Sequence, residues 1–512
     1  MYKSSLLINI FFLLINQFVF ADVKLPAIIS DNLVLQQNSN AVLWGWADAG
    51  EAITVSNSWN NQTVKTVADQ NGAWKLVLKT IKAGGPYSVT IKGKNLIELH
   101  NVMLGEVWLC SGQSNMEFPL ERQESWKTGG LNTEQEIAQA NYPNIRLFTV
   151  EKNTSVIPLK DVKGKWAECS PATARRFSAV AYYFGKEIWK ETGVPVGLIH
   201  SSWGGTPAES WTKKEVLESD VDYKPIFDRL KKAEEDYPKS VTLYEQQLEQ
   251  WKKDSATAKQ KGDTITKAPS KPRAVSYYQA PSYLYNAMIV PLVPYTLKGV
   301  IWYQGESNAG RAYQYRKLFP AMIANWRKDW NSEFPFYFVQ IAPYEGQGPE
   351  IREAQLLTML SVPKTGMAVT TDAGDSLDIH PKNKEVVGKR LALWALANDY
   401  GKKNLEYSGP VYKSMKAEND KIRITFDHAA GLEAKDGLFT EFTIAGDDQK
   451  FLPGQAKIEG NTVVVWNDLI TKPVAVRYSW KNVPHPNLYN KTGLPASPFR
   501  TDQWQGETFG KN

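Results

Sequence analysis

The sequence predicts an α/β fold in which a parallel sheet flanked by helices lies between two β-sandwich domains. Within residues 104–403, short apolar runs alternate with longer segments whose apolar residues recur at helical spacing. This pattern is typical of a parallel sheet covered by helices. Within residues 22–103 and 404–512, runs of period two are separated by turn residues, which indicates β-rich domains. We therefore expect three domains, as a chain of this length allows.

Residues 1–21 are predicted to be a signal peptide. Lys3 supplies a positive charge, an apolar run extends from Leu6 to Phe20, and Ala21 is the small residue expected before a cleavage site. Three polar residues interrupt the apolar run, which argues against a membrane anchor. We expect an exported protein, periplasmic or secreted, with no membrane span once the signal peptide is removed.

The chain has the composition of an ordinary globular protein. Of 512 residues, 22% are charged and 42% are hydrophobic. Loss of Lys3 lowers the formal net charge from +6 to +5, and this small excess is spread along the chain. Because nucleic-acid binding needs clustered positive charge, we expect no nucleic-acid partner. The sequence leaves the oligomeric state open.

The predicted N-terminal domain, residues 22–103, is built from β-type runs that include AVLWGW, AITVSN, WKLVLKT and YSVTIKG, with turns at 48–50 and 83–86. Its expected role is packing and substrate presentation. The predicted C-terminal domain, residues 404–512, contains the similar runs KIRITFDHA, FTEFTIAGDD and NTVVVWND. Its last segment, from residue 487, carries no strand pattern and is expected to pack back on the α/β domain.

In the α/β region, apolar runs predict strands at 107–110, 194–201, 300–304, 334–343 and 366–372. Helical periodicity predicts helices at 177–192, 313–330, 350–360 and 384–401. Four of the predicted strands lead into polar blocks, at 111–115, 200–206, 304–308 and 375–381. Because the carboxyl ends of parallel strands meet at one edge of a sheet, we expect these blocks to converge there.

Residues 212–276 form a predicted helical insertion in this region. Charged helical segments are followed by a stretch rich in Lys, Ser, Thr and Pro at 255–273. The insertion is longer than ordinary connections, so we interpret it as either a lid or a packing element with a flexible return.

Ser114, in the turn after the first of these strands, is the candidate nucleophile. A serine hydroxyl needs a base to take its proton and donors to hold the resulting oxyanion. Of the five histidines, only His380 has a carboxylate two residues before it, Asp378, and a proline directly after it. Asp378 can accept the Nδ1 proton and stabilise the imidazolium. The remaining histidines are His100, His200, His428 and His485; His200 is the rival base.

The two remaining polar blocks supply candidate oxyanion donors. The glycine pair ending at Gly205 can bring a backbone N–H close to a small ligand. The side-chain amides of Gln304 and Asn308 can aim N–H groups at an oxygen. We expect no metal site at His380, because further His, Cys or carboxylate ligands do not occur at recognisable spacing.

The four blocks resemble those of SGNH-type hydrolases. Within that group, the segments SGQSNM, WYQGESN and DIHPxNK are similar to the sialate O-acetylesterase family and its relatives among acetylxylan esterases. The resemblance covers roughly residues 100–400, and its motifs are specific in combination. It implies a flavodoxin-like α/β domain, removal of O-acetyl groups from sugars, and no cofactor.

Carried over block by block, the resemblance implies that Ser114 is the nucleophile, His380 the base, and Gly205 with Gln304 or Asn308 the oxyanion donors. The chain departs from the general SGNH pattern at the acid, which usually precedes the histidine by three positions. That position is Leu377 here, so Asp378 is the preferred acid and Asp375 the alternative.

Three further residues near these blocks are candidates for supporting roles. Glu306 is expected either to orient Gln304, Asn308 or the backbone around Ser114, or to touch substrate. Asn115 is a candidate hydrogen-bond partner beside the nucleophile, and Trp203 is a candidate stacking surface for a sugar ring.

The sequence thus predicts an exported serine esterase that deacetylates carbohydrates through an acetyl-serine intermediate, with an O-acetylated sugar or glycan as substrate. One alternative is an acetylxylan or other polysaccharide O-acetylesterase; another is a non-catalytic glycan-binding protein. Export would also permit a disulfide between Cys110 and Cys169, although a buried thiol is the simpler interpretation of Cys110.

Overall fold

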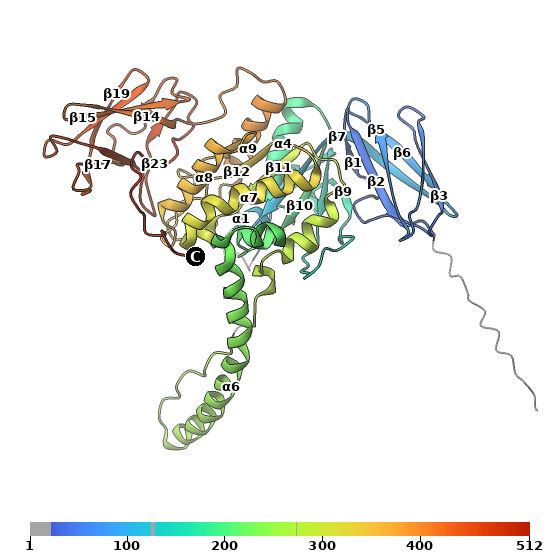
Figure 1. Cartoon of the computed structure of the whole chain (residues 1–512), viewed down its shortest axis with the longest axis horizontal. Coiled ribbons are helices and arrows are strands. Elements are labelled where there is room, and N and C mark those ends of the chain that lie inside the picture. The colour runs from blue at the N-terminus through green and yellow to red at the C-terminus, as the bar shows by residue number, and fades with distance from the viewer. Residues whose placement is uncertain (1–21, 124–128, 273) are drawn as a thin grey trace, which may run out of the picture.

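The computed structural model of the chain describes residues 22–123, 129–272 and 274–512 (Figure 1). The predicted signal peptide lies outside the described residues. A β-rich domain, a central α/β domain and a second β-rich domain follow one another along the molecule, and a helical arm projects from the central domain (Figure 1).

The centre of the molecule is a sheet in the order β13-β12-β11-β7-β10-β8-β9. Its strands are β7 (Leu96–Gly112), β8 (Tyr142–Thr149), β9 (Trp166–Cys169), β10 (Val196–Ser202), β11 (Gly299–Tyr303), β12 (Phe336–Val339) and β13 (Thr365–Ala368). All neighbours are parallel except β8 and β9. The predicted fold class, a parallel sheet flanked by helices, is confirmed.

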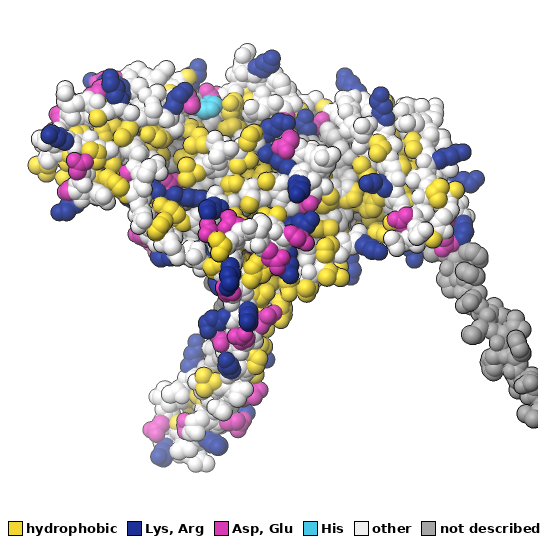
Figure 2. Space-filling view, viewed as in Figure 1, with side chains coloured by type: hydrophobic (Ala, Val, Ile, Leu, Met, Phe, Trp, Pro, Cys, Tyr) yellow, Lys and Arg dark blue, Asp and Glu magenta, His cyan; other side chains and the backbone are white. Residues whose placement is uncertain are grey.

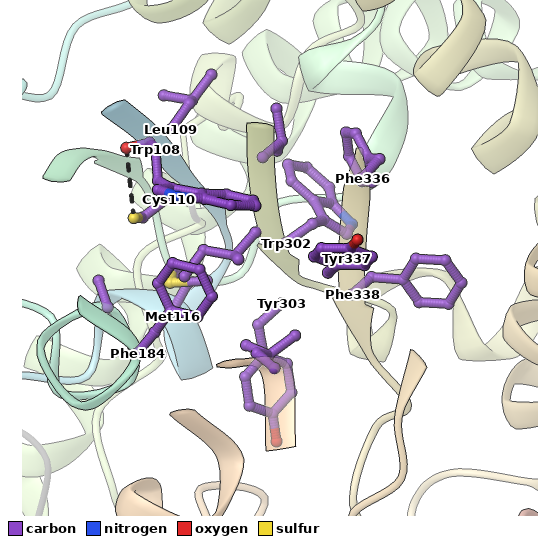
Figure 3. Close-up of a cluster of buried hydrophobic side chains, with 14 of the residues drawn as sticks. Trp108, Leu109, Cys110, Met116, Phe184, Trp302, Tyr303, Phe336, Tyr337 and Phe338 are labelled. Atoms are coloured by element: carbon purple, nitrogen blue, oxygen red, sulfur yellow. Dashed lines mark hydrogen bonds between the residues drawn. The ribbon is translucent and has the colours of Figure 1, made fainter. Parts of the chain in front are cut away.

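Helices cover both faces of this sheet. They are α4 (Ala179–Thr192), α7 (Ala312–Trp330), α8 (Pro349–Ser361) and α9 (Lys384–Asp399). On one face the ring of Trp108 lies 4.9 Å from that of Phe184 in α4. On the other, Trp302 contacts Trp326 in α7 at 5.7 Å. These rings belong to one continuous apolar core, which fixes the strands whose ends carry the polar blocks. Figure 3 shows Trp108, Phe184 and Trp302 within this core.

The N-terminal domain consists of β1 (Val34–Gln36), β2 (Asn40–Trp46), β3 (Ala52–Asn57), β4 (Thr63–Val67), β5 (Ala73–Lys79) and β6 (Gly84–Lys92). The first half of β7 pairs with β6 and β1, and its second half pairs with β10 and β11. One unbroken strand therefore crosses the expected boundary at residues 103 and 104.

Strand β8 is not among the strands that the sequence predicts. Arg146 interrupts its apolar run, yet the side chain is buried. It forms an ion pair with Glu168 at 3.3 Å and donates to Asn101 Oδ1 at 3.0 Å. Since these partners come from elsewhere in the chain, the local hydrophobic pattern does not reveal the strand.

The insertion contains α5 (Lys214–Glu218), the 3-10 helix η3 (Val221–Tyr223) and α6 (Lys224–Lys261). Helix α6 projects away from the body of the protein (Figure 1), and side chains of both charges cover it (Figure 2). The return segment runs back along the helix, where Trp251 Nε1 donates to Thr266 O at 2.8 Å. The structure thus shows a projecting arm whose return segment reaches the central domain.

The C-terminal domain has two four-stranded antiparallel sheets, in the orders β14-β15-β20-β19 and β18-β17-β21-β23, and the pair β16-β22. The strands are β14 (Val411–Glu418), β15 (Lys421–Asp427), β16 (Glu433–Ala434), β17 (Phe442–Ala445), β18 (Leu452–Pro453), β19 (Gln455–Glu459), β20 (Thr462–Trp466), β21 (Ala475–Tyr478), β22 (Leu488–Tyr489) and β23 (Phe499–Arg500).

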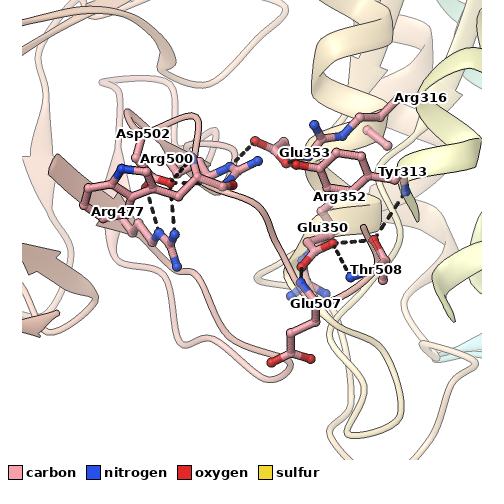
Figure 4. A network of polar contacts seen from close by, with 12 residues as sticks. Tyr313, Arg316, Glu350, Arg352, Glu353, Arg477, Arg500, Asp502, Glu507 and Thr508 are labelled. Carbon is pink, nitrogen blue, oxygen red and sulfur yellow. Dashed lines mark hydrogen bonds and ion pairs between the residues drawn. The ribbon is translucent and has the colours of Figure 1, made fainter. Parts of the chain in front are cut away.

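The end of the chain packs back on the central domain. Arg500 donates to Glu353 of α8 at 2.6 Å, and the Thr508 N–H donates to Glu350 at 3.0 Å (Figure 4). The C-terminal segment therefore contacts helix α8 through buried charged groups, in addition to the covalent connection between the two domains.

Cys110 and Cys169 are both free, buried thiols, as the simpler interpretation expected. None of the helices in the described part of the chain combines the length and the apolar character needed to cross a bilayer.

Candidate active site

The end of β7 delivers Ser114 to the carboxyl edge of the sheet. Gly112 has φ +138°, and a Cβ there would lie 2.2 Å from the carbonyl oxygen of Tyr303. Only glycine fits this close crossing of two strand ends. The chain then turns into the short helix α1 (Ser114–Glu117), so Ser114 stands at its first position.

Ser114 and His380 meet although 266 positions separate them in sequence. Ser114 Oγ lies 2.9 Å from His380 Nε2, which is hydrogen-bond distance. His380 belongs to the loop between β13 and α9. A hydroxyl in this position can pass its proton to the imidazole as it attacks an electrophile.

Asp378 lies on the other side of the imidazole. Its Oδ1 accepts the backbone N–H of His380 at 2.9 Å and lies 3.6 Å from His380 Nδ1. Asp375 instead accepts the Leu377 N–H at 3.0 Å. The geometry therefore favours Asp378 over Asp375 as the acid partner of His380.

The surroundings of His380 keep its imidazole neutral. Its pKa falls to about 4, chiefly because burial disfavours the charged form and secondarily because Lys384 is nearby, while Asp378 opposes both effects. A neutral imidazole at pH 7 is available to accept the Ser114 proton.

The glycine loop after β10 lies directly beside Ser114. A Cβ on Gly204 would come within 3.1 Å of Ser114 Cβ, and Gly205 adopts φ +75°. The loop is held from two sides: the Gly204 N–H donates to Glu117 at 2.6 Å, and the Gly205 carbonyl accepts from Gln279 Nε2 at 2.7 Å. Gln279 follows the insertion by three residues, so the chain that leaves the insertion contacts this loop.

The Gln304 amide does not match the expectation that it faces an oxyanion. Its Nε2 donates to Asn308 Oδ1 at 2.7 Å and to Thr206 O at 3.3 Å, and its Oε1 accepts from Tyr315 at 3.0 Å. Both amide protons are thus occupied in tying two loops together. Partners on three segments set this orientation, which sequence alone does not reveal.

Asn308 lies in the 3-10 helix η7 (Glu306–Arg311) and joins the same two loops. Its Oδ1 also accepts the Ala208 N–H at 2.9 Å, and its Nδ2 donates to Glu209 at 2.8 Å. Among the residues that the structure describes, Glu209 is the one acceptor recorded for Nδ2, so Asn308 retains a donor that Gln304 lacks.

Asn115 and Glu306 form a buried network with a residue that sequence reasoning missed, Lys384. Asn115 Nδ2 donates to Glu306 Oε1 at 2.6 Å and to the carbonyl of Ile379 at 3.0 Å. Lys384, in the first turn of α9 and only 1% exposed, donates to Asn115 Oδ1. Because Ile379 precedes His380, this network fixes the loop that carries His380. Lys384 is the final residue of the DIHPxNK block, and this position in the motif could have indicated its role.

Burial shifts the two charged members of the network in opposite directions. The pKa of Lys384 falls to about 7, since burial outweighs the attraction of Glu306 and Asp378. Burial also raises the pKa of Glu306. Both shifts favour the uncharged forms, so the two side chains lie in a low-dielectric environment beside the site.

Trp203 and His200 each contact a side chain outside the Ser114–His380 pair. Trp203 stacks on Tyr278 with ring centroids 5.2 Å apart and an interplanar angle of 9°, so Tyr278 covers one of its faces. His200 Nε2 lies 2.6 Å from Ser202 Oγ. Burial lowers the pKa of His200 to about 3. The structure therefore brings His380, and not His200, to Ser114.

A parallel α/β sheet that presents a serine, a histidine and a carboxylate at its carboxyl edge is typical of an esterase. The family model described as carbohydrate esterase, sialic acid-specific acetylesterase, matches residues 104–267 and 264–397. The chain belongs to this family of carbohydrate esterases.

Known relatives resemble the chain over nearly its whole length. Sialate O-acetylesterase of Rattus norvegicus is 32% identical, with 93% of this chain and 94% of that protein covered. The human sialate O-acetylesterase is 30% identical, with 94% of each covered. The crystal structure of a carbohydrate acetylesterase from Xanthomonas citri has a TM-score of 0.79 and 36% identity, and covers 94% of this chain and 100% of its own.

Proposed function

We propose that this protein removes O-acetyl groups from carbohydrates, with O-acetylated sialic acids as its preferred substrates, through an acetyl-Ser114 intermediate. The contact between Ser114 Oγ and His380 Nε2 at 2.9 Å carries the proposal. The names of the relatives support the substrate: two are sialate O-acetylesterases and one is a carbohydrate acetylesterase.

In the first step, Ser114 Oγ attacks the acetyl carbonyl while His380 Nε2 takes the hydroxyl proton. Asp378 stabilises the imidazolium that forms. His380 then protonates the departing sugar oxygen, which leaves the acetyl group on Ser114. In the second step, a water molecule gives its proton to His380 and attacks the acetyl-enzyme, which releases acetate and restores Ser114.

The negative charge on the carbonyl oxygen needs donors near Ser114. The backbone N–H groups of Ser114 and Gly205 are the first two, because the glycine loop lies against the Ser114 side chain. Asn308 is the third, since Gln304 has both amide protons engaged. Loss of one such donor is expected to cost about 2.7 to 4 kcal/mol of transition-state stabilisation.

The route needs no cofactor, and we propose that the protein acts after export, as its predicted signal peptide implies. An acetylated xylan or other polysaccharide is the alternative substrate. The residues around Ser114 act on the acetyl group, and they do not determine which sugar carries it. A non-catalytic glycan-binding role is disfavoured by the intact contact between Ser114 and His380.

One assay tests both the mechanism and the substrate assignment. Acetate release is measured from O-acetylated sialic acid, acetylated xylo-oligosaccharides and p-nitrophenyl acetate, for the wild type and Ser114→Ala. We expect the highest kcat/KM on the sialic acid and complete dependence on Ser114. Release by Ser114→Ala at the wild-type rate would exclude the mechanism, and preference for xylo-oligosaccharides would exclude the substrate assignment.

A further inference from the structure

A cavity of about 480 Å³ lies where the helical arm joins the central domain. Its walls come from α6, from the return segment, and from the loops that follow β10 and β11. The lining includes Pro207, Glu209, Arg229, Gln279, Ser307 and Arg311.

This cavity shares walls with the candidate oxyanion loops. Pro207 follows Gly205 by two residues, and Ser307 directly precedes Asn308. Gln279 lines the cavity and donates from its Nε2 to the Gly205 carbonyl at 2.7 Å. A group bound here therefore lies beside the loops that carry Gly205 and Asn308.

Two guanidinium groups in the cavity wall share one carboxylate. Glu209, whose side chain is 3% exposed, accepts from Arg229 Nη2 at 3.2 Å and from Arg311 Nη2 at 2.7 Å. Its second oxygen accepts from Asn308 at 2.8 Å. The remaining carboxylate in the lining, Asp236, pairs with Lys232 at 2.7 Å. The arginine cluster thus carries one positive charge more than Glu209 neutralises.

Both arginines also retain donors that are not used. Arg229 Nη1 and Arg311 Nε are buried and have no hydrogen-bond partner among the residues that the structure describes. Buried guanidinium N–H groups are rarely left unpaired, because desolvation without a partner is unfavourable. Burial, and secondarily the charge of Arg311, lower the pKa of Arg229, while Glu209 opposes both effects.

We propose that Arg229 and Arg311 bind the carboxylate of an acidic sugar, and that this contact selects acidic over neutral acetylated substrates. Guanidinium groups suit this task because they present several N–H groups in fixed directions to the two carboxylate oxygens. The inference rests on the proposed deacetylase function and adds to it the recognition of the substrate's charge. It also gives the insertion a role, since Arg229 lies on α6.

The test compares each acidic substrate with its own methyl ester, which removes the negative charge and keeps the acetyl group. The substrates are O-acetylated N-acetylneuraminic acid and an acetylated glucuronoxylo-oligosaccharide, at pH 7. We expect the wild type to favour at least one free acid over its ester in kcat/KM by about tenfold to a hundredfold, the scale of a charged hydrogen bond. The substrate that gives the larger ratio identifies the acidic sugar.

In Arg229→Gln this ratio is expected to fall close to one, and in Arg229→Lys to an intermediate value. The matched control is Lys252→Gln, because Lys252 lies on the same helix, is exposed, and is outside the cavity lining. Its ratio is expected to equal that of the wild type. Since each ratio is measured within one protein, a variant that folds poorly still reports its selectivity.

Failure of this inference is distinguishable from failure of the proposed function. A wild-type ratio near one for both sugars, or an unchanged ratio in Arg229→Gln, would overturn the carboxylate site while acetate release continued. Absence of acetate release from every substrate, including p-nitrophenyl acetate, would overturn the deacetylase function itself.

Discussion

Lys384 donates a hydrogen bond to Asn115 Oδ1 in the buried layer beneath the loop that carries His380. The same asparagine donates to the carbonyl of Ile379, the residue before His380. The buried Lys384 side chain thus acts on His380 in two ways: through the position of the His380 loop, and through its electric field when it is protonated.

The first prediction concerns the electric field of Lys384. Its positive charge is one cause of the lowered pKa of His380, so Lys384→Met is expected to raise that pKa from about 4. His380 must be neutral to act as a base, and the acid limb of the kcat/KM profile should therefore move to higher pH. Lys389→Met, on the exposed side of the same helix, is the control. An acid limb at the wild-type position would contradict this role.

The second prediction concerns the position of the loop. Asn115→Ala removes the hydrogen bonds to Ile379 and Glu306 and leaves buried polar groups unpaired, at about 1 to 3 kcal/mol each. We expect kcat to fall more than tenfold on p-nitrophenyl acetate while KM changes little, because the small substrate does not depend on this network for binding. Asn461→Ala, at an exposed site in the C-terminal domain, serves as control. Equal effects on kcat and KM would count against a positioning role.

The third prediction separates the two candidate acids. Asp378→Asn is expected to lower kcat by about 10²- to 10⁴-fold, because an amide cannot stabilise the imidazolium in the same way. Asp375→Asn should stay within a few-fold of the wild type, since Asp375 accepts the Leu377 N–H rather than facing His380. Steady-state rates on p-nitrophenyl acetate decide the matter, and the reverse order of effects would assign the acid to Asp375.

The fourth prediction concerns stability rather than activity. Burial lowers the pKa of His200 to about 3, compared with an ordinary value near 6.5. Between these values the unfolded chain binds a proton that the folded chain does not, so stability is lost as pH falls through this window. The contribution is at most about 1.4 kcal/mol per pH unit. Urea unfolding between pH 4 and 7 should show a weaker pH dependence in His200→Gln than in the wild type.

His485→Gln is the matched control for this series, because His485 is exposed. Its unfolding midpoints should follow those of the wild type at each pH. If His200→Gln keeps the full pH dependence, another group is responsible for it.

Sequence reasoning located the polar blocks because the rule behind it is geometric: parallel strands present their carboxyl ends at one edge. It identified Ser114 and His380, which the structure brings within 2.9 Å. The run of short strands flanking the α/β region likewise predicted the β-rich domains, although the unbroken strand β7 joins the first of them to the central sheet.

The features that sequence reasoning missed depend on partners far away in the chain. Strand β8 was missed because the charged residue Arg146 interrupts its apolar run. The burial of Arg146 depends on Glu168 and Asn101. The orientation of the Gln304 amide depends on Thr206 and Tyr315, and the role of Lys384 depends on Asn115. A polar side chain carries no local sign of which distant group will satisfy it, so these assignments required coordinates.

The most direct test of Ser114 as the nucleophile is to trap the acyl-enzyme. The protein is mixed with p-nitrophenyl acetate, quenched in acid during the first turnover, digested, and analysed by mass spectrometry. We predict an acetyl group on Ser114, and its absence from the corresponding peptide of Ser114→Ala. An acetyl group on another residue, or turnover by Ser114→Ala at the wild-type rate, would contradict the central claim that Ser114 is the nucleophile.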